Sequence, residues 1–207
     1  MTRLGFTLAR LLRREEPLCA LSVPQADVLA DWAGRRVALV GNARGLAEGR
    51  NGAAIDAADI VIRINRAPMP AAASHGTRTD ALALATALDG AQMRRIRPGR
   101  ILWMSPKRKR LPWAVATHPG FYLHPQDDIA RLQALLGAPP STGAMMIDLL
   151  ARSSTARIDL YGFDFFATLS LSGRRGAADV PHDFSAEAQR VQTLLAQDSR
   201  FFLHPHG

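Results

Sequence analysis

Short apolar runs alternate with helix-like stretches along this chain, and that alternation limits the folds available to it. Helical patterns fall near residues 127–136 and 143–152. The apolar runs are typical of strands that are covered on both faces, and they span residues 37–40, 59–65, 81–85, 101–104 and 158–161. Strands that alternate with helices form mostly parallel sheets. The sequence therefore predicts an α/β fold, a single Rossmann-like domain with helices flanking a mostly parallel central sheet.

The length allows one such domain. A chain of 207 residues with 47% hydrophobic content can bury one α/β core and is short for two. We expect an N-terminal helical segment over residues 1–34 and the main domain over residues 35–207.

Residues 3–14 form an amphipathic pattern within this N-terminal segment. Such a helix could lie on an anionic membrane surface, or it could dock on the core of the protein, and the pattern leaves both interpretations open. The apolar face of the pattern consists of Leu4, Leu8, Leu11 and Leu12. The basic residues around it are Arg3, Arg10, Arg13 and Arg14.

The overall charge indicates an anionic ligand or surface. The formal net charge is +8, and most of the excess is arginine, which binds phosphate and carboxylate groups bidentately. The aromatic content is 6% and no nucleic-acid motif accompanies the basic residues, so we do not expect nucleic-acid binding.

The cysteine content and the hydropathy of the chain indicate the cellular compartment in which it is expected to function. Cys19 is the single cysteine, so no internal disulfide can form. No apolar run is long enough to span a bilayer, and no signal peptide is recognisable. We expect a cytoplasmic protein, with a peripheral contact to the inner face of the membrane through residues 3–14 as the open alternative.

Polar residues follow two of the predicted strands. Gly41 and Asn42 end the first strand, and Asn65 ends the second. Ligands of open parallel sheets bind beyond the carboxyl ends of the strands, so both asparagines could face one cleft. An asparagine amide can bind phosphate, ribose or a base, whereas the alternative role for each is a turn residue. The segment is not a G-x-G-x-x-G fingerprint, and no phosphate loop occurs.

Three longer blocks make the interpretation specific. Residues 37–42 (VALVGN), 52–68 (GAAIDAADIVIRINRAP) and 76–79 (GTRT) together closely resemble the large sialylmotif of glycosyltransferase family 29, the animal-type sialyltransferases. Residues 140–143 (PSTG) and 158–163 (IDLYGF) resemble the small sialylmotif, and residues 182–187 (HDFSAE) resemble the H-x-x-x-x-E motif of the same family. The segment from Tyr161 to Phe166 is also faintly similar to bacterial sialyltransferases of family 42, which use the same class of donor.

The resemblance implies roles for individual residues. Asn42 and Asn65 would contact the CMP moiety of the donor, and His182 would be the catalytic base. Ser141, Thr142 and Gly143 would line the donor pocket, and residues 35–207 would form a sialyltransferase-like catalytic domain, a variant related to the GT-A fold.

Physical reasoning adds to two of these roles. Ser141 and Thr142 precede a predicted helix, whose start can bind an anion or can simply be capped by a hydroxyl. His182 also precedes a predicted helix, where the positive end of the dipole favours a neutral imidazole that can act as a base. The alternative for His182 is a capping or surface residue.

The sequence departs from the family pattern at one motif. Family 29 enzymes have a further His-containing motif between the second and third blocks, and its histidine is thought to support the leaving phosphate. Arg174 and Arg175 occupy that interval here and could supply the positive charge. His118 and His124 are weaker candidates. No D-x-D triplet occurs, and Asp56 and Asp59 fit a structural role better, so we expect no cofactor and no required metal.

The sequence therefore predicts an inverting glycosyltransferase that moves sialic acid from CMP-sialic acid to a glycan or glycolipid hydroxyl. A related ulosonic acid donor, CMP-linked 3-deoxy-manno-octulosonic acid (Kdo), stays open because it shares the CMP and the anomeric carboxylate. A non-enzymatic or degenerate basic module at a membrane surface is the second interpretation. A nicotinamide-dependent oxidoreductase is disfavoured because the glycine fingerprint is missing.

Overall fold

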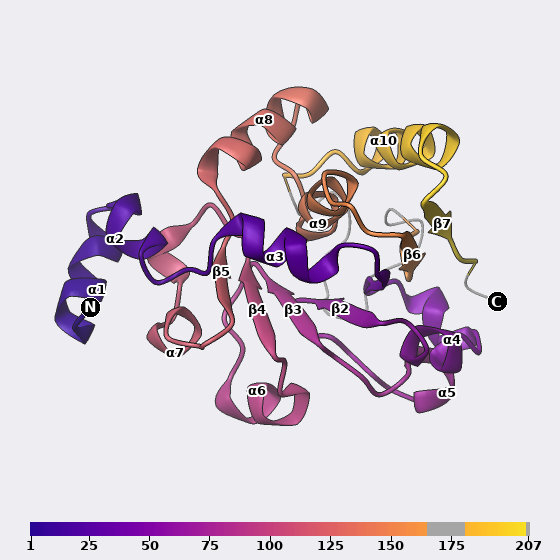
Figure 1. The fold of residues 1–207 in the computed structure, drawn as a ribbon, viewed down its shortest axis with the longest axis horizontal. Coiled ribbons are helices and arrows are strands. Elements are labelled where there is room, and N and C mark those ends of the chain that lie inside the picture. Colours follow the sequence, from indigo (N-terminus) through magenta and orange to yellow (C-terminus); the bar gives the residue numbers. More distant parts are fainter. Residues whose placement is uncertain (165–180, 206–207) are drawn as a thin grey trace.

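The computed structural model describes residues 1–164 and 181–205. Within them the chain forms one parallel sheet with helices on both faces (Figure 1). The strands are β1 (Arg36–Val40), β2 (Ile60–Ile64), β3 (Ala81–Leu84), β4 (Arg100–Trp103), β5 (Phe121–Leu123), β6 (Arg157–Tyr161) and β7 (Phe201–Leu203). This architecture confirms the predicted Rossmann-like α/β fold.

The strand order places a topological switch point beside the first strand. The sheet runs β5-β4-β3-β2-β1-β6-β7, and every neighbouring pair is parallel. The chain thus builds outward from β1 to β5 and then returns to the other side of β1 with β6. Open α/β sheets bind ligands at such a reversal, outside the carboxyl ends of the strands.

The helices form two layers, and alternate strand residues face each layer. They are α1 (Arg3–Leu11), α2 (Glu15–Cys19), α3 (Gln25–Trp32), α4 (Gly52–Asp56), α5 (Ala72–His75), α6 (Gly90–Ile96), α7 (Trp113–Ala116), α8 (Gln126–Leu136), α9 (Thr142–Ala151) and α10 (Phe184–Gln197), with the 3-10 turns η1 (Arg44–Glu48) and η2 (Arg108–Arg110). Residues of α3, α8, α9 and α10 share one buried cluster with Leu39 and Ile62. Residues of α1, α2, α6 and α7 pack with Leu82 and Trp103 on the opposite face.

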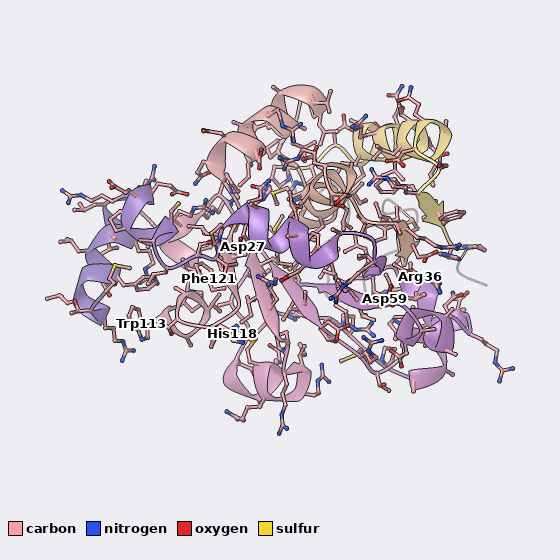
Figure 2. The ribbon with its side chains drawn as sticks, in the orientation of Figure 1. Asp27, Arg36, Asp59, Trp113, His118 and Phe121 are labelled. Atoms are coloured by element: carbon pink, nitrogen blue, oxygen red, sulfur yellow. The ribbon has the colours of Figure 1, made fainter. Side chains whose placement is uncertain are left out.

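The N-terminal segment contributes to both layers. Phe6 of α1 and Leu18 of α2 are buried beneath one face of the sheet, whereas Val28 and Trp32 of α3 are buried on the other. Trp113 of α7 packs edge-on against Phe6, with ring centroids 5.1 Å apart (Trp113 is labelled in Figure 2). The division into residues 1–34 and 35–207 stays a prediction.

Two edge strands were not predicted from the sequence. β5 and β7 have three residues each, Phe121–Leu123 and Phe201–Leu203, which is too short to give a clear periodicity. Residues 105–120 are rich in proline and basic residues, a composition that predicts a mobile surface loop, and this prediction is wrong. This segment carries η2 and α7, and it buries the guanidinium of Arg108, which donates to Glu15 Oε1 (2.8 Å) and to the carbonyl oxygen of His124 (2.6 Å). The basic run therefore contains one buried arginine, which is paired with the half-buried carboxylate of Glu15.

None of the helices in residues 1–164 and 181–205 is long and apolar enough to cross a lipid bilayer.

Candidate active site

A cavity of about 220 Å³ opens at the switch point, between the carboxyl ends of β1, β2 and β6 and the helices α9 and α10. Its wall joins segments from all three sequence blocks. The predicted residues that line it are Gly41, Asn42, Asn65, Ser141, Thr142, Gly143 and His182. Two predicted residues, Arg174 and Arg175, lie outside the described residues.

Gly41 brings the tips of two strands into contact. Its amide donates to the carbonyl oxygen of Tyr161 (2.7 Å), and a Cβ atom at Gly41 would lie only 2.3 Å from the carbonyl oxygen of Gly162. No side chain fits in that space. The close backbone approach that glycine permits here therefore occurs between the ends of β1 and β6, and Gly41 and Gly162 both line the cavity.

The two asparagines are held by the backbone of their neighbours. The Nδ2 of Asn42 donates to the carbonyl oxygen of Ile64 (3.2 Å), which ties the tip of β1 to the tip of β2. The Oδ1 of Asn65 accepts from the amide of Ala85 (2.9 Å), and its Nδ2 lies 3.5 Å from Thr142 Oγ1. Asn65 also has a φ of +53°, a left-handed conformation that asparagine tolerates well. Each asparagine therefore has a structural role and still lines the cavity.

Ser141 is fully engaged at the start of α9. Its Oγ accepts from the amide of Ala144 (3.1 Å), the typical N-cap interaction. The same hydroxyl donates to Glu187 Oε2, and the Ser141 amide donates to Glu187 Oε1, both at 2.7 Å. The capping role is thus observed, and the hydroxyl and amide of Ser141 are both engaged by the protein itself. Within the described part of the chain, the amides of Thr142 and Gly143 have no acceptor, and both residues line the cavity.

His182 is oriented from outside the cavity. Its Nδ1 lies 2.7 Å from the carbonyl oxygen of Pro139. A carbonyl oxygen only accepts, so Nδ1 carries the proton and, in the neutral ring, Nε2 is the nitrogen that can accept one. Asp183 caps α10 immediately afterwards, accepting from the amides of Ser185 and Ala186 at 3.0 Å each. A histidine arranged in this way is suited to general-base chemistry.

Glu187 and Arg190 also line the cavity, and neither was assigned a role from the sequence. Glu187 was quoted only as part of a motif, yet it connects α10 to the start of α9. Arg190 follows one helical turn later and is the only lysine or arginine among the described residues that line the cavity. The described part of the chain offers it no hydrogen-bond or ion-pair partner. The spacing of Phe184, Glu187 and Val191 on one helix face was the signal that could have placed it near the site.

The other candidate residues lie elsewhere. Asp59 accepts from the amide of Arg36 (2.8 Å; both are labelled in Figure 2), and Asp56 Oδ2 accepts from the amide of Thr77 (2.8 Å). Both carboxylates therefore organise the backbone. His118 Nδ1 accepts from the amide of Gly120 (3.1 Å), and His124 is buried, which lowers its pKa to about 4. Residues 1–164 and 181–205 contain no cluster of three or more His, Cys, Asp or Glu side chains that could hold a metal ion.

Comparisons with known proteins agree with the resemblance. The model of glycosyltransferase family 29 (sialyltransferase) matches residues 18–99, which confirms the family resemblance; the second and third blocks lie outside the matched residues. No curated protein matches the chain.

Solved structures show the same fold. A mammalian sialyltransferase in complex with Gal-beta-1-3GalNAc-ortho-nitrophenol is similar with a TM-score of 0.60 and 19% identity, over 99% of this chain and 87% of that one. A second crystal structure of a mammalian sialyltransferase gives 0.59 and 22%, over 83% and 69%. The sialyltransferase CstII from Campylobacter jejuni, in complex with the substrate analogue CMP-3FNeuAc, gives 0.52 and 12%, over 82% and 80%.

Proposed function

We propose that this chain, a relative of the sialyltransferases of glycosyltransferase family 29, transfers a sialic-acid-type sugar from a CMP-activated donor to a hydroxyl of a glycan or glycolipid. One observation carries the proposal. Residues from three sequence blocks, which extend from Gly41 to Glu187, line a single cavity at the switch point of the sheet. The complex of C. jejuni CstII with the substrate analogue CMP-3FNeuAc supports the choice of a CMP-linked donor.

The donor would bind across the tips of β1 and β2. Asn42 and Asn65 would contact the cytidine and ribose, and Gly41 would keep the strand tips close enough to form the floor. The amides of Thr142 and Gly143, at the positive end of α9, would bind the phosphate or the carboxylate of the donor. Arg190 would supply a positive charge from the opposite wall, alongside Arg174 and Arg175 if these reach the cavity.

His182 would act as the general base. Its Nε2 would take the proton of the acceptor hydroxyl as the acceptor oxygen attacks the anomeric carbon, and the bond between that carbon and the phosphate oxygen would break. CMP would leave with the electron pair. Attack from the face opposite the leaving group inverts the anomeric configuration. We propose that no metal ion takes part; loss of transfer in EDTA that Mg²⁺ restores would contradict this.

Release of CMP from a series of donors tests the function. We expect release from CMP-sialic acid or CMP-Kdo, and none from UDP- or GDP-sugars, with the better CMP donor settling the sugar. CMP and CDP should raise the melting temperature, and NAD should not. Binding of CMP without turnover of either donor would favour the degenerate, non-enzymatic module instead.

A further inference from the structure

The outer face of α1 exposes leucines that the sheet does not cover. The helix docks on the core through Phe6 and Ala9, which are 1% and 4% exposed. At 100° per residue the leucines form a separate stripe turned away from that contact. They are Leu4, Leu8, Leu11 and Leu12, with exposures of 81%, 53%, 54% and 54%. The helix therefore docks on the core and also leaves its apolar face uncovered.

The tertiary structure places basic residues from a distant segment beside α1. The turn η2 packs against α1, and Arg10 Nη1 donates to the carbonyl oxygen of Leu111 (2.8 Å). Glu15 is engaged by buried Arg108, so Glu16 is the exposed acid beside α1. We define the α1 surface as the four leucines together with the exposed basic residues Arg3, Arg13, Arg14, Lys107, Lys109 and Arg110.

We propose that the α1 surface binds an anionic lipid bilayer, with α1 lying in the plane of the headgroups. Leucines would enter the boundary of the acyl chains while the surrounding cations bind lipid phosphates. Charge favours a bilayer over a second copy of the chain, because a twofold interface through this surface would bring like charges together. α1 lies at one end of the long axis of the molecule, and α10 lies toward the other (Figure 1). Binding would leave the cavity open.

Vesicle flotation of the full chain tests this proposal independently of transfer activity. We expect binding to vesicles of phosphatidylcholine and phosphatidylglycerol, much weaker binding to phosphatidylcholine alone, and release by salt. Leu8→Gln should weaken binding about tenfold, because a leucine no longer enters the bilayer. Its matched control is Leu135→Gln on α8, where the leucine is 56% exposed and binding should not change.

A second pair of variants tests the charge. Lys109→Gln with Arg110→Gln should weaken binding about thirtyfold, from about 1 kcal/mol per basic residue near an anionic surface. Arg94→Gln with Arg95→Gln removes two exposed charges on α6 and should have little effect. Equal losses in a variant and its control, or no binding of the unmodified chain to anionic vesicles, would overturn the proposal. A dimer in solution that Leu8→Gln converts to a monomer would assign the surface to a second copy instead.

Discussion

Glu187 and Ser141 form a double hydrogen bond that joins the third sequence block to the second. One carboxylate oxygen accepts from the Ser141 amide and the other from its hydroxyl, both at 2.7 Å. Burial raises the pKa of Glu187, and the two bonds from Ser141 oppose that shift. The contact therefore fixes α10, and with it His182, against the start of α9.

Loss of the contact between Glu187 and Ser141 should affect stability and donor binding more than the chemical step of transfer. Glu187→Ala is expected to lower the free energy of unfolding by about 2 kcal/mol, because the half-buried Ser141 amide loses its acceptor. It should also raise the KM for the donor. Glu187→Gln keeps an acceptor oxygen and should restore most of both quantities. Thermal unfolding with donor kinetics checks this; equal losses in the two variants would contradict it.

His182 should affect turnover without affecting donor binding. His182→Ala and His182→Gln are expected to lower kcat about 10²- to 10⁴-fold, the usual contribution of a general base. The melting-temperature increase caused by CMP should persist, because the proposed contacts to CMP come from other residues. Transfer assays and CMP titrations on the same preparations separate the two effects. Full turnover in either variant would remove His182 from the mechanism.

Arg190 should affect donor binding. Arg190→Gln is expected to raise the KM for the donor about tenfold, and Arg190→Lys should restore part of the affinity because it keeps the charge. Arg50→Gln removes an exposed charge outside the cavity and is the control. If Arg174→Ala with Arg175→Ala impairs the enzyme and Arg190→Gln does not, the phosphate is bound by the segment that precedes α10.

Asp159 should make the fold sensitive to acid. Its carboxylate is fully buried in β6 and accepts from Arg36 Nε (2.7 Å) and His204 Nε2 (2.6 Å). Burial acts to raise the pKa of Asp159, but the bonds from Arg157, Arg36 and His204 outweigh it and lower the pKa. The pKa of Asp159 is lower in the folded protein than in the unfolded chain, where it is about 3.9. The ionised carboxylate therefore stabilises the fold fully above the unfolded pKa, and this stabilisation is lost as the pH falls through the folded pKa.

Asp159→Asn tests that dependence. The variant should be less stable by about 2–3 kcal/mol at neutral pH and should lose part of its acid dependence. Asp127→Asn, at an exposed position, should change neither quantity much. Urea unfolding at several pH values gives both; an unchanged acid dependence in Asp159→Asn would contradict the assignment.

The sequence by itself determined the class of fold and predicted several of the residues that line the cavity. The runs at residues 37–40 and 158–161 are apolar enough to be strands buried on both faces, so a parallel sheet followed from local pattern alone. Asn42, Asn65 and His182 were predicted because their positions in three ordered blocks resemble one family. The order and spacing of such blocks can be read directly from the amino-acid sequence.

Only the tertiary structure decided which groups remain available to a ligand. The Ser141 hydroxyl is committed to Ala144 and Glu187, and the latter is 46 positions away. Arg190 lines the cavity, whereas Arg108, from the basic run at residues 107–110, is buried and paired with Glu15. Contacts between distant positions depend on how helices pack across the sheet, and that packing leaves no periodicity in the sequence from which the partners could be predicted.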